Sequence, residues 1–307
     1  MSTPPPLRTH HVTDTAVVPG KPRFSVLSWN TLADGLAQNG SFSRCPASAL
    51  AFSHRLPLLL EEIYRHDADI VILQEVNRHE AFDSALSERG YVGAFARKAF
   101  SACTGLGFPE DGVAIFFRAS RFKLVDAPKQ AAYVSDGHPM SQCWLSLSLL
   151  DKEAQRPLLV ATTHLKAKNT KEFAALRLNQ ARQLVTVLEA TVEMSERERP
   201  GIVLGGDFNA LLSEACCEEI TRSQLELTPC TRDVPPELAF STWKYRRSDD
   251  GSEFEKCCVI DHMWHCAQLT HVATRAQPTK EECGPGALPS PAYASDHLAQ
   301  WNAFQWR

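Results

Sequence analysis

The sequence has no long uninterrupted run of apolar residues. No stretch approaches the roughly 20 apolar residues that a membrane-spanning helix requires, and the N-terminal segment has no apolar core of a secretory signal. Arg8 is the only arginine before residue 23, which is atypical of an organelle transit peptide. We therefore expect a protein without a membrane span, located in the cytoplasm, although targeting by the N-terminal segment stays open.

Cysteine is sparse for a protein held together by disulfides. The chain has 10 cysteines in 307 residues, whereas secreted disulfide scaffolds are short and much richer in cysteine. Cys216-Cys217 and Cys257-Cys258 are adjacent pairs, without the two-residue spacer of a zinc knuckle. Most cysteines are expected to be reduced thiols of the core or the surface.

The chain also lacks an excess of positive charge. Its 32 lysines and arginines are outnumbered by 36 aspartates and glutamates, which gives a net charge of -4. A protein that grips a long nucleic acid usually carries a basic stripe, because each neutralised phosphate adds affinity through counterion release. The bulk charge therefore disfavours a polymer substrate.

The length of 307 residues allows one large α/β domain or two small ones. Residues 1–22 contain Pro4-Pro5-Pro6 and Pro19-Gly20, show no hydrophobic periodicity and are predicted to form a flexible tail. The chain is 44% hydrophobic, which suffices for a substantial core. The motifs described next extend from residue 30 to residue 297, so no division leaves them complete on one side. We predict a single catalytic domain over residues 23–307.

Four short polar clusters stand out from the rest of the chain. They are Trp29-Asn30, Gln74-Glu75, Gly206-Asp207-Phe208-Asn209 and Ser295-Asp296-His297. Apolar runs of strand length lead into such groups at residues 24–28, 69–73 and 201–204, and a fourth run at 158–163 leads into His164. If these strands lie side by side, their ends form one rim and the polar groups meet there. Carboxylate, carboxamide and imidazole groups suit the metal-assisted hydrolysis of a phosphate ester.

In order and spacing, these clusters resemble the endonuclease/exonuclease/phosphatase family from about residue 22 to the C-terminus. His164, Ser241-Thr242-Trp243 and Asp261 add to the resemblance. It implies an α/β fold, a four-layer sandwich in which two packed mixed β-sheets are flanked by helices. Helical spacing of leucines within 54–66 and 173–194 agrees with outer helices. The Asp111-Gly112 pair is interpreted as an ordinary turn at the start of a strand.

The resemblance implies a catalytic role for five residues. Asp207 would activate or orient the attacking water, and Asn209 would help to position it. His164 and His297 would donate hydrogen bonds or positive charge to the reacting phosphoryl group. Asp261 would orient His297.

The same resemblance implies a divalent cation as cofactor. Mg²⁺, with Mn²⁺ as an alternative, would be held by Glu75 together with Asn30 or Asp296, directly or through water. Magnesium prefers oxygen ligands and keeps several waters, so few carboxylates suffice.

Secondary motifs narrow the choice within the family. Residues 121–125, 164–168 and 242–244 resemble a deadenylase-related branch whose members remove the 2′-phosphate of NADP(H). The lysines that distinguish this branch match Lys98, Lys166 and Lys168, which are expected to bind the substrate. If the strand before His164 continued, Lys166 and Lys168 would share one of its faces.

The predicted function is a Mg²⁺-dependent phosphatase that converts NADPH or NADP⁺ to NAD(H) and phosphate. A 3′ exoribonuclease acting on poly(A) is the alternative, and a nucleic acid is a partner only in that case. A binding module with a dead site is disfavoured, because every expected ligand and base is present.

Overall fold

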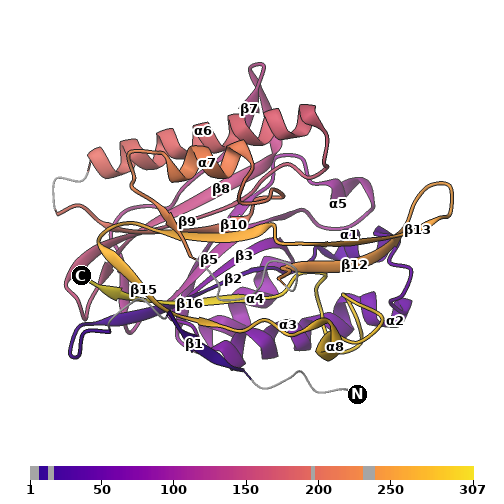
Figure 1. Cartoon of the computed structure of the whole chain (residues 1–307), viewed down its shortest axis with the longest axis horizontal. Helices are drawn as coiled ribbons and strands as arrows, with labels where there is room; N and C mark the ends of the chain where they lie inside the picture. Colours follow the sequence, from indigo (N-terminus) through magenta and orange to yellow (C-terminus); the bar gives the residue numbers. More distant parts are fainter. Residues whose placement is uncertain (1–6, 13–16, 195–197, 231–238) are drawn as a thin grey trace.

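The computed structural model describes residues 7–12, 17–194, 198–230 and 239–307. Two seven-stranded β-sheets pack face to face, and helices cover their outer faces (Figure 1). In this view α6 (Lys171–Glu193) and α7 (Ala215–Thr221) lie above the sheets, and α3 (Phe52–His66) lies below them. The four-layer α/β sandwich expected from the family resemblance is confirmed.

The first sheet has the order β1–β15–β16–β2–β3–β5–β4. Its strands are β1 (Thr9–His11), β15 (Leu269–Arg275), β16 (Gln300–Trp306), β2 (Arg23–Asn30), β3 (Ile70–Asn77), β5 (Asp111–Arg118) and β4 (Tyr91–Arg97). β2 and β3 are parallel neighbours, and every residue of β3 is buried. A central strand covered on both faces is apolar along its length, which explains the unbroken run at residues 70–73.

The second sheet has the order β11–β14–β10–β9–β8–β6, with β7 paired to β8. Its strands are β11 (Thr228–Pro229), β14 (Asp261–His265), β10 (Gly201–Asp207), β9 (Arg156–His164), β8 (His138–Asp151), β6 (Phe122–Leu124) and β7 (Lys129–Ser135). β9 and β10 are parallel, whereas β8 and β14 run antiparallel to them. The sheet is therefore mixed, like the first.

Apolar side chains from both sheets fill the space between them. Val26 and Ile72 of the first sheet belong to the same buried cluster as Leu147 and Val160 of the second. Full burial of each such side chain stabilises the fold by about 1.5–3 kcal/mol. The contact between the sheets makes the rim above it a rigid platform.

The helices predicted from leucine spacing correspond to α3 and α6. Leu59 and Ile63 of α3 pack on the first sheet, and Leu184 and Leu188 of α6 pack on the second. The shorter helices are α1 (Asp34–Asn39), α2 (Ala47–Leu50), α4 (His79–Ser87), α5 (Ala102–Gly105) and α8 (Lys280–Cys283).

The C-terminal ends of the parallel strands meet at one rim. Asn30 lies beside Gln74 in the register of β2 and β3, and His164 lies beside Asp207 in the register of β9 and β10. Asp261, the first residue of β14, is paired with Asp207. Within each sheet, strand pairing thus brings together residues that are far apart in the sequence.

A separate hairpin extends from this end of the molecule. β12 (Thr242–Arg247) and β13 (Glu253–Cys258) form a two-stranded sheet that lies at the right of Figure 1. A β-bridge between Thr242 and His297 anchors the hairpin at the rim. The basic side chains of the hairpin therefore lie at the same rim as the strand ends.

Part of the N-terminal segment joins the first sheet. Thr9–His11 form β1, which pairs antiparallel with β15. Residues 1–6 and 13–16 lie outside the described part of the chain, so the flexible tail over residues 1–22 stays a prediction. All ten cysteines are free thiols. None of the described helices is both long enough and apolar enough to cross a membrane.

Candidate active site

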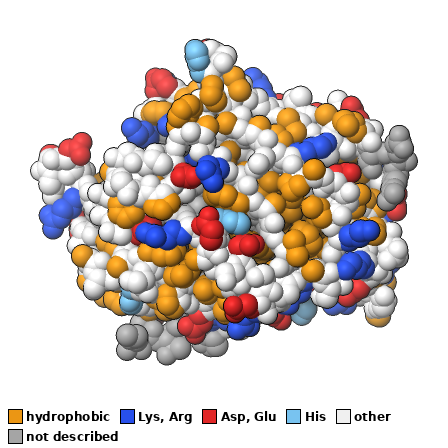
Figure 2. Space-filling model, turned by 180° about the vertical axis from the view of Figure 1, so that it is seen from behind, with side chains coloured by type: hydrophobic (Ala, Val, Ile, Leu, Met, Phe, Trp, Pro, Cys, Tyr) orange, Lys and Arg blue, Asp and Glu red, His pale blue; other side chains and the backbone are white. Residues whose placement is uncertain are grey.

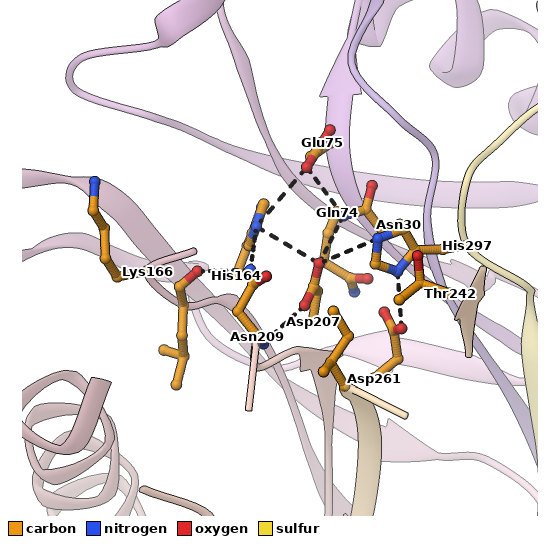
Figure 3. Close-up of polar contacts among 12 residues, drawn as sticks. Asn30, Gln74, Glu75, His164, Lys166, Asp207, Asn209, Thr242, Asp261 and His297 are labelled. Atoms are coloured by element: carbon orange, nitrogen blue, oxygen red, sulfur yellow. Dashed lines mark hydrogen bonds and ion pairs between the residues drawn. The ribbon is translucent and has the colours of Figure 1, made fainter. Parts of the chain in front are cut away.

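Side chains from the two sheets meet through Asn30. Its Nδ2 donates a hydrogen bond to Glu75 Oε1 at 3.1 Å and another to Asp207 Oδ2 at 2.9 Å. Glu75 comes from the first sheet and Asp207 from the second, so Asn30 joins candidate site residues of both. Figure 3 shows these three residues with His164 and His297 facing one another.

Two residues of the site have left-handed backbone conformations. Glu75 has φ +53° at an irregularity of the β3–β5 ladder, and Asn209 has φ +48° just after β10. Such conformations cost free energy for residues with a side chain and persist where the surroundings compensate for them. Glu75 Oε2 accepts a hydrogen bond from the Ala33 amide at 3.0 Å, and Asp207 Oδ1 accepts one from the Asn209 amide at 2.9 Å. The unfavourable backbone conformations and the hydrogen bonds that compensate for them both lie at the rim.

Asp207 occupies the centre of the group. Its Oδ2 is 3.7 Å from His164 Nε2 and 3.8 Å from His297 Nε2, and the residue is only 1% exposed. A carboxylate between two imidazoles can accept a proton or orient a water while its charge is balanced nearby.

His297 is held as a cation. Its Nδ1 lies 2.8 Å from Asp261 Oδ2, which also accepts a hydrogen bond from Ser241 Oγ at 2.5 Å. Burial alone would lower the pKa of His297, but the carboxylates of Asp261, Asp296 and Asp207 outweigh burial and raise the pKa to about 9. The ring is therefore charged at neutral pH, with Nε2 turned toward Asp207.

His164, in contrast to His297, is neutral. Burial and the positive charge of Lys98 lower the pKa of His164 to about 4, despite the nearby Asp207. Asn209 Nδ2 lies 3.1 Å from His164 Nε2 and also donates to the Leu165 carbonyl oxygen at 3.1 Å. The sequence predicted the same kind of role for both histidines, whereas the structure provides one neutral ring and one cation.

Lys98 is buried and paired with an acid that sequence reasoning passed over. Its Nζ is 2.5 Å from Asp111 Oδ2, and Ser101 Oγ donates to Asp111 Oδ1 at 2.5 Å. Burial would lower the pKa of Lys98, but Asp111 and Glu75 outweigh burial and raise it. Asp111 was interpreted as part of a turn because an Asp-Gly pair at the start of a strand carries no signal of a buried ion pair.

Asp296 is neutralised by cations of the β12–β13 hairpin. Lys244 Nζ contacts Asp296 Oδ2, and Arg246 Nη2 lies 3.7 Å from the same oxygen. Burial would raise the pKa of Asp296, but Lys244 and His297 hold it well below its usual range. Asp296, which was predicted as a metal ligand, thus has a lysine as its partner. No local sequence motif predicts this pair.

Two overlapping groups of side chains could hold a metal ion. Ligand atoms of Glu75, His164 and Asp207 all lie within 4.8 Å of one another, and so do those of Asp207, Asp261 and His297. Within the described residues Asp296 belongs to neither group. Glu75 and Asp207 supply hard carboxylate oxygens, so the first group fits a cation such as Mg²⁺.

Lys166 and Lys168 lie in a loop and not in a strand. β9 ends at His164, so the expectation of a continuing strand is wrong. Both ammonium groups nevertheless lie over one ring, because Lys166 Nζ is 5.3 Å and Lys168 Nζ 5.6 Å from the centre of the Phe173 ring. Figure 3 shows Lys166 to one side of the carboxylates.

A buried arginine supports the site from below. Arg55 of α3 is completely buried, and its Nη1 donates to the carbonyl oxygens of Thr31 and Ala294 at 3.0 Å each. Thr31 follows Asn30, and Ala294 precedes the Ser-Asp-His cluster. One guanidinium therefore ties together two loops that carry functional residues.

Comparison with known proteins shows the family of the chain. A family model described as Endonuclease/Exonuclease/phosphatase family matches residues 27–297. Nocturnin of Xenopus laevis is 33% identical over 285 residues, which cover 90% of this chain and 71% of that protein. The share of the relative is 64% for the nocturnins of Rattus norvegicus and Homo sapiens, so the chain spans about two thirds of their length.

Two further matches bear on the reaction. The solved human Nocturnin catalytic domain with bound sulfate anion has a TM-score of 0.76 and 26% identity, and the match covers 100% of both chains. The CCR4-Not complex 3′-5′-exoribonuclease subunit Ccr4 of Coccidioides immitis (strain RS) is 38% identical over 113 residues, which cover 34% of this chain and 14% of that protein. The matches include both the branch indicated by the secondary motifs and an exoribonuclease.

Proposed function

The chain belongs to the endonuclease/exonuclease/phosphatase family, and on that premise we propose that it is a Mg²⁺-dependent phosphatase that removes the 2′-phosphate of NADP(H). The products would be NAD(H) and phosphate. The observation that carries the proposal is the pair of lysines over the Phe173 ring, in the loop that follows His164. Two cations over one ring suit a compact, highly charged substrate.

The proposed cation is Mg²⁺, with Mn²⁺ as the alternative. Glu75 and Asp207 would hold it together with His164, while Asn30 orients both carboxylates and Asp296 contributes through water. Bound there, the ion would polarise a phosphoryl oxygen and lower the pKa of a water molecule.

The protein side chains divide the remaining work. Asp207 takes a proton from the attacking water, which Asn209 helps to position. His297 donates from Nε2 to the phosphoryl group, and its positive charge offsets the charge that develops there. Asp261 keeps the ring in the required orientation through Nδ1. As the water oxygen bonds to phosphorus, the bond from phosphorus to the ribose 2′ oxygen breaks, and that oxygen leaves as a hydroxyl with a proton taken from solvent water.

The 3′ exoribonuclease remains the second candidate, because the similarity to Ccr4 favours it. The same groups could attack a phosphodiester and release AMP from poly(A). Charge argues against a polymer substrate, since the chain carries a net -4 and basic and acidic side chains are interspersed on the face shown in Figure 2. We also propose a cytoplasmic location, as the composition predicts.

The decisive experiment offers both substrates to one preparation. Purified protein with Mg²⁺ is incubated with NADPH or with oligo(A), and the release of phosphate and of AMP is measured separately. Phosphate from NADPH with little AMP from oligo(A) supports the phosphatase, and the reverse supports the exoribonuclease. Neither product, at protein concentrations that bind NADPH, would indicate a binding module.

A further inference from the structure

The first turns of α6 present three side chains to the loop that carries Lys166 and Lys168. Phe173, Arg177 and Gln180 are four and three residues apart, which places them on one face of the helix. The loop ends at Thr170, whose hydroxyl oxygen accepts a hydrogen bond from the Phe173 amide and caps the helix. Helix and loop are consecutive in the sequence and in contact in space.

Arg177 and Gln180 fix the backbone of this loop. The completely buried guanidinium of Arg177 donates from Nη1 to the carbonyl oxygens of Lys166 at 3.2 Å and Lys168 at 2.7 Å. Gln180 Oε1 accepts a hydrogen bond from the Lys166 amide at 2.9 Å. Lys168 has φ +83°, which is unfavourable for a residue with a side chain, so its conformation depends on these contacts.

Phe173 holds the side chains of Lys166 and Lys168. Both ammonium groups lie over its ring, at 5.3 and 5.6 Å from the centre, within the range of a cation–π interaction. In the described part of the chain neither Lys166 nor Lys168 has a carboxylate oxygen within 4.0 Å. Two like charges repel and would move apart in water, yet here they share one ring although no carboxylate of the described residues forms an ion pair with either of them.

We propose that Phe173, supported by Arg177 and Gln180, is a positioning residue that holds Lys166 and Lys168 ready for a substrate anion. The inference rests on the proposed function, which makes these lysines substrate ligands. A free lysine loses much side-chain freedom when it binds, and an arrangement formed beforehand reduces that loss. Phe173 therefore sets the affinity for the substrate and leaves the chemical step unchanged.

The test replaces the ring while keeping its bulk. Phe173→Leu, with Phe173→Met as a second apolar variant, should raise KM for NADPH about three- to tenfold while kcat stays within about twofold. Phe173→Tyr keeps the ring and should remain close to the wild type. Thermal unfolding of each variant identifies any that lose the fold, and Arg182→Ala, which removes an exposed cation of the same helix, serves as the control.

A double-mutant cycle separates positioning from mere packing. In a Lys166→Ala/Lys168→Ala background, Phe173→Leu should have almost no further effect on KM, because the cations it holds are gone. The inference is overturned if the effect of Phe173→Leu persists in that background, or if kcat falls in place of a rise in KM. It is also overturned if Phe173→Leu has no effect although the lysine variants do.

The proposed function fails in a different way. If Lys166→Ala and Lys168→Ala leave NADPH hydrolysis unchanged, the lysines are not ligands of that substrate, whatever Phe173 does. If the protein degrades oligo(A) and not NADPH, the same series is measured with oligo(A), and the criterion for Phe173 stays the same. Each outcome thus supports or contradicts either the proposed function or the positioning role of Phe173.

Discussion

The charge of each imidazole is set by neighbours from distant parts of the chain. His297 is a cation because acids surround it, whereas His164 is neutral because Lys98 adds its charge to the effect of burial. One positively charged ring and one neutral ring around Asp207 allow charge stabilisation and hydrogen bonding without competition for the same proton.

Asp261→Asn should move the alkaline limit of activity to lower pH. The pKa of His297 is raised from its usual 6.5 to about 9, and Asp261 is the largest cause that raises it. Without that charge the pKa falls, so the fraction of charged His297 at pH 8 decreases and the limit shifts by about one pH unit or more. The raised pKa of His297 also stabilises the folded protein. This stabilisation is complete below about pH 6.5 and is lost as pH rises through about 9. Profiles of kcat/KM against pH, compared with Asp249→Asn at an exposed loop, provide the measurement.

Asp207→Asn should leave substrate binding largely intact and slow the reaction. The amide keeps the size of the side chain but cannot take the proton of the attacking water, so kcat should fall on the order of 10² to 10⁴. Steady-state kinetics with NADPH measure it. A kcat within a few fold of the wild type would mean that another group activates the water.

Glu75→Gln should weaken the response to the metal ion. The variant keeps the size of the side chain and one acceptor oxygen, so it can keep the hydrogen bond from Asn30 or the one from the Ala33 amide, but it loses the negative charge that suits a divalent cation. The Mg²⁺ concentration for half-maximal activity should rise about tenfold or more, as each lost charge-assisted contact contributes roughly 1.5–3 kcal/mol. Glu80→Gln, on an exposed position of α4, is the control, and full activity in excess chelator would contradict a metal mechanism.

At the scale of elements, α3 does more than cover a sheet. Arg55 is one of its buried residues and donates to the loops that contain Thr31 and Ala294. Burial lowers the pKa of Arg55, while the acids Asp34 and Asp296 oppose that effect. The helix thus places a cation beneath an acidic site and fixes the relative position of β2 and the Ser-Asp-His cluster.

Arg55→Met should destabilise the protein by about 3–5 kcal/mol, because carbonyl groups lose their donor and buried carboxylates lose a nearby cation. Arg55→Lys should have a smaller effect because it keeps the positive charge, but it should still destabilise, since one ammonium cannot reproduce the planar fork of a guanidinium. Urea unfolding monitored by fluorescence gives both values. Arg89→Met removes an exposed arginine that stacks on Tyr64, and a loss as large as that of Arg55→Met would show that burial is not the cause.

The sequence predicted those strands and helices that have a local hydrophobic pattern. The apolar runs before Asn30, Glu75, His164 and Asp207 are strands, because burial on both faces requires continuous apolar residues. The end of β9 at His164 had no such signal. The loop after it is shaped by Arg177, which lies outside any local motif.

The site was predictable where residue type and strand end coincide, and not where pairing is remote. Asp207, His164 and Asp261 are adjacent through the registers of β9, β10 and β14. The partners of Lys98 and Asp296, in contrast, are set by an ion pair at the start of β5 and by a hairpin that joins the rim from elsewhere. Such pairs depend on the folded arrangement of loops, which residue type alone does not encode.

At the scale of the whole molecule, the charge distribution separates a compact substrate from a polymer. The net charge of -4 would repel a long polyanion, while a few cations act at short range at the rim. Lys166 and Lys168 are two such cations, and they are concentrated at Phe173. A substrate whose charge is concentrated in one place gains from this arrangement, and an extended chain gains little.

Salt dependence of the reaction should therefore be shallow. A protein that contacts six to ten phosphates of a nucleic acid loses roughly 10³ to 10⁵ in affinity between 50 and 200 mM salt. With two lysines as the main contacts, kcat/KM for NADPH should fall by less than about tenfold over the same range. The Lys166→Ala/Lys168→Ala double variant should start at least about tenfold lower and show a flatter dependence, because the charges that salt screens are gone. The measurement is kcat/KM at several salt concentrations for NADPH and for oligo(A) side by side. Efficient AMP release with a steep salt dependence, together with NADPH kinetics indifferent to both lysines, would reverse the assignment in favour of an exoribonuclease.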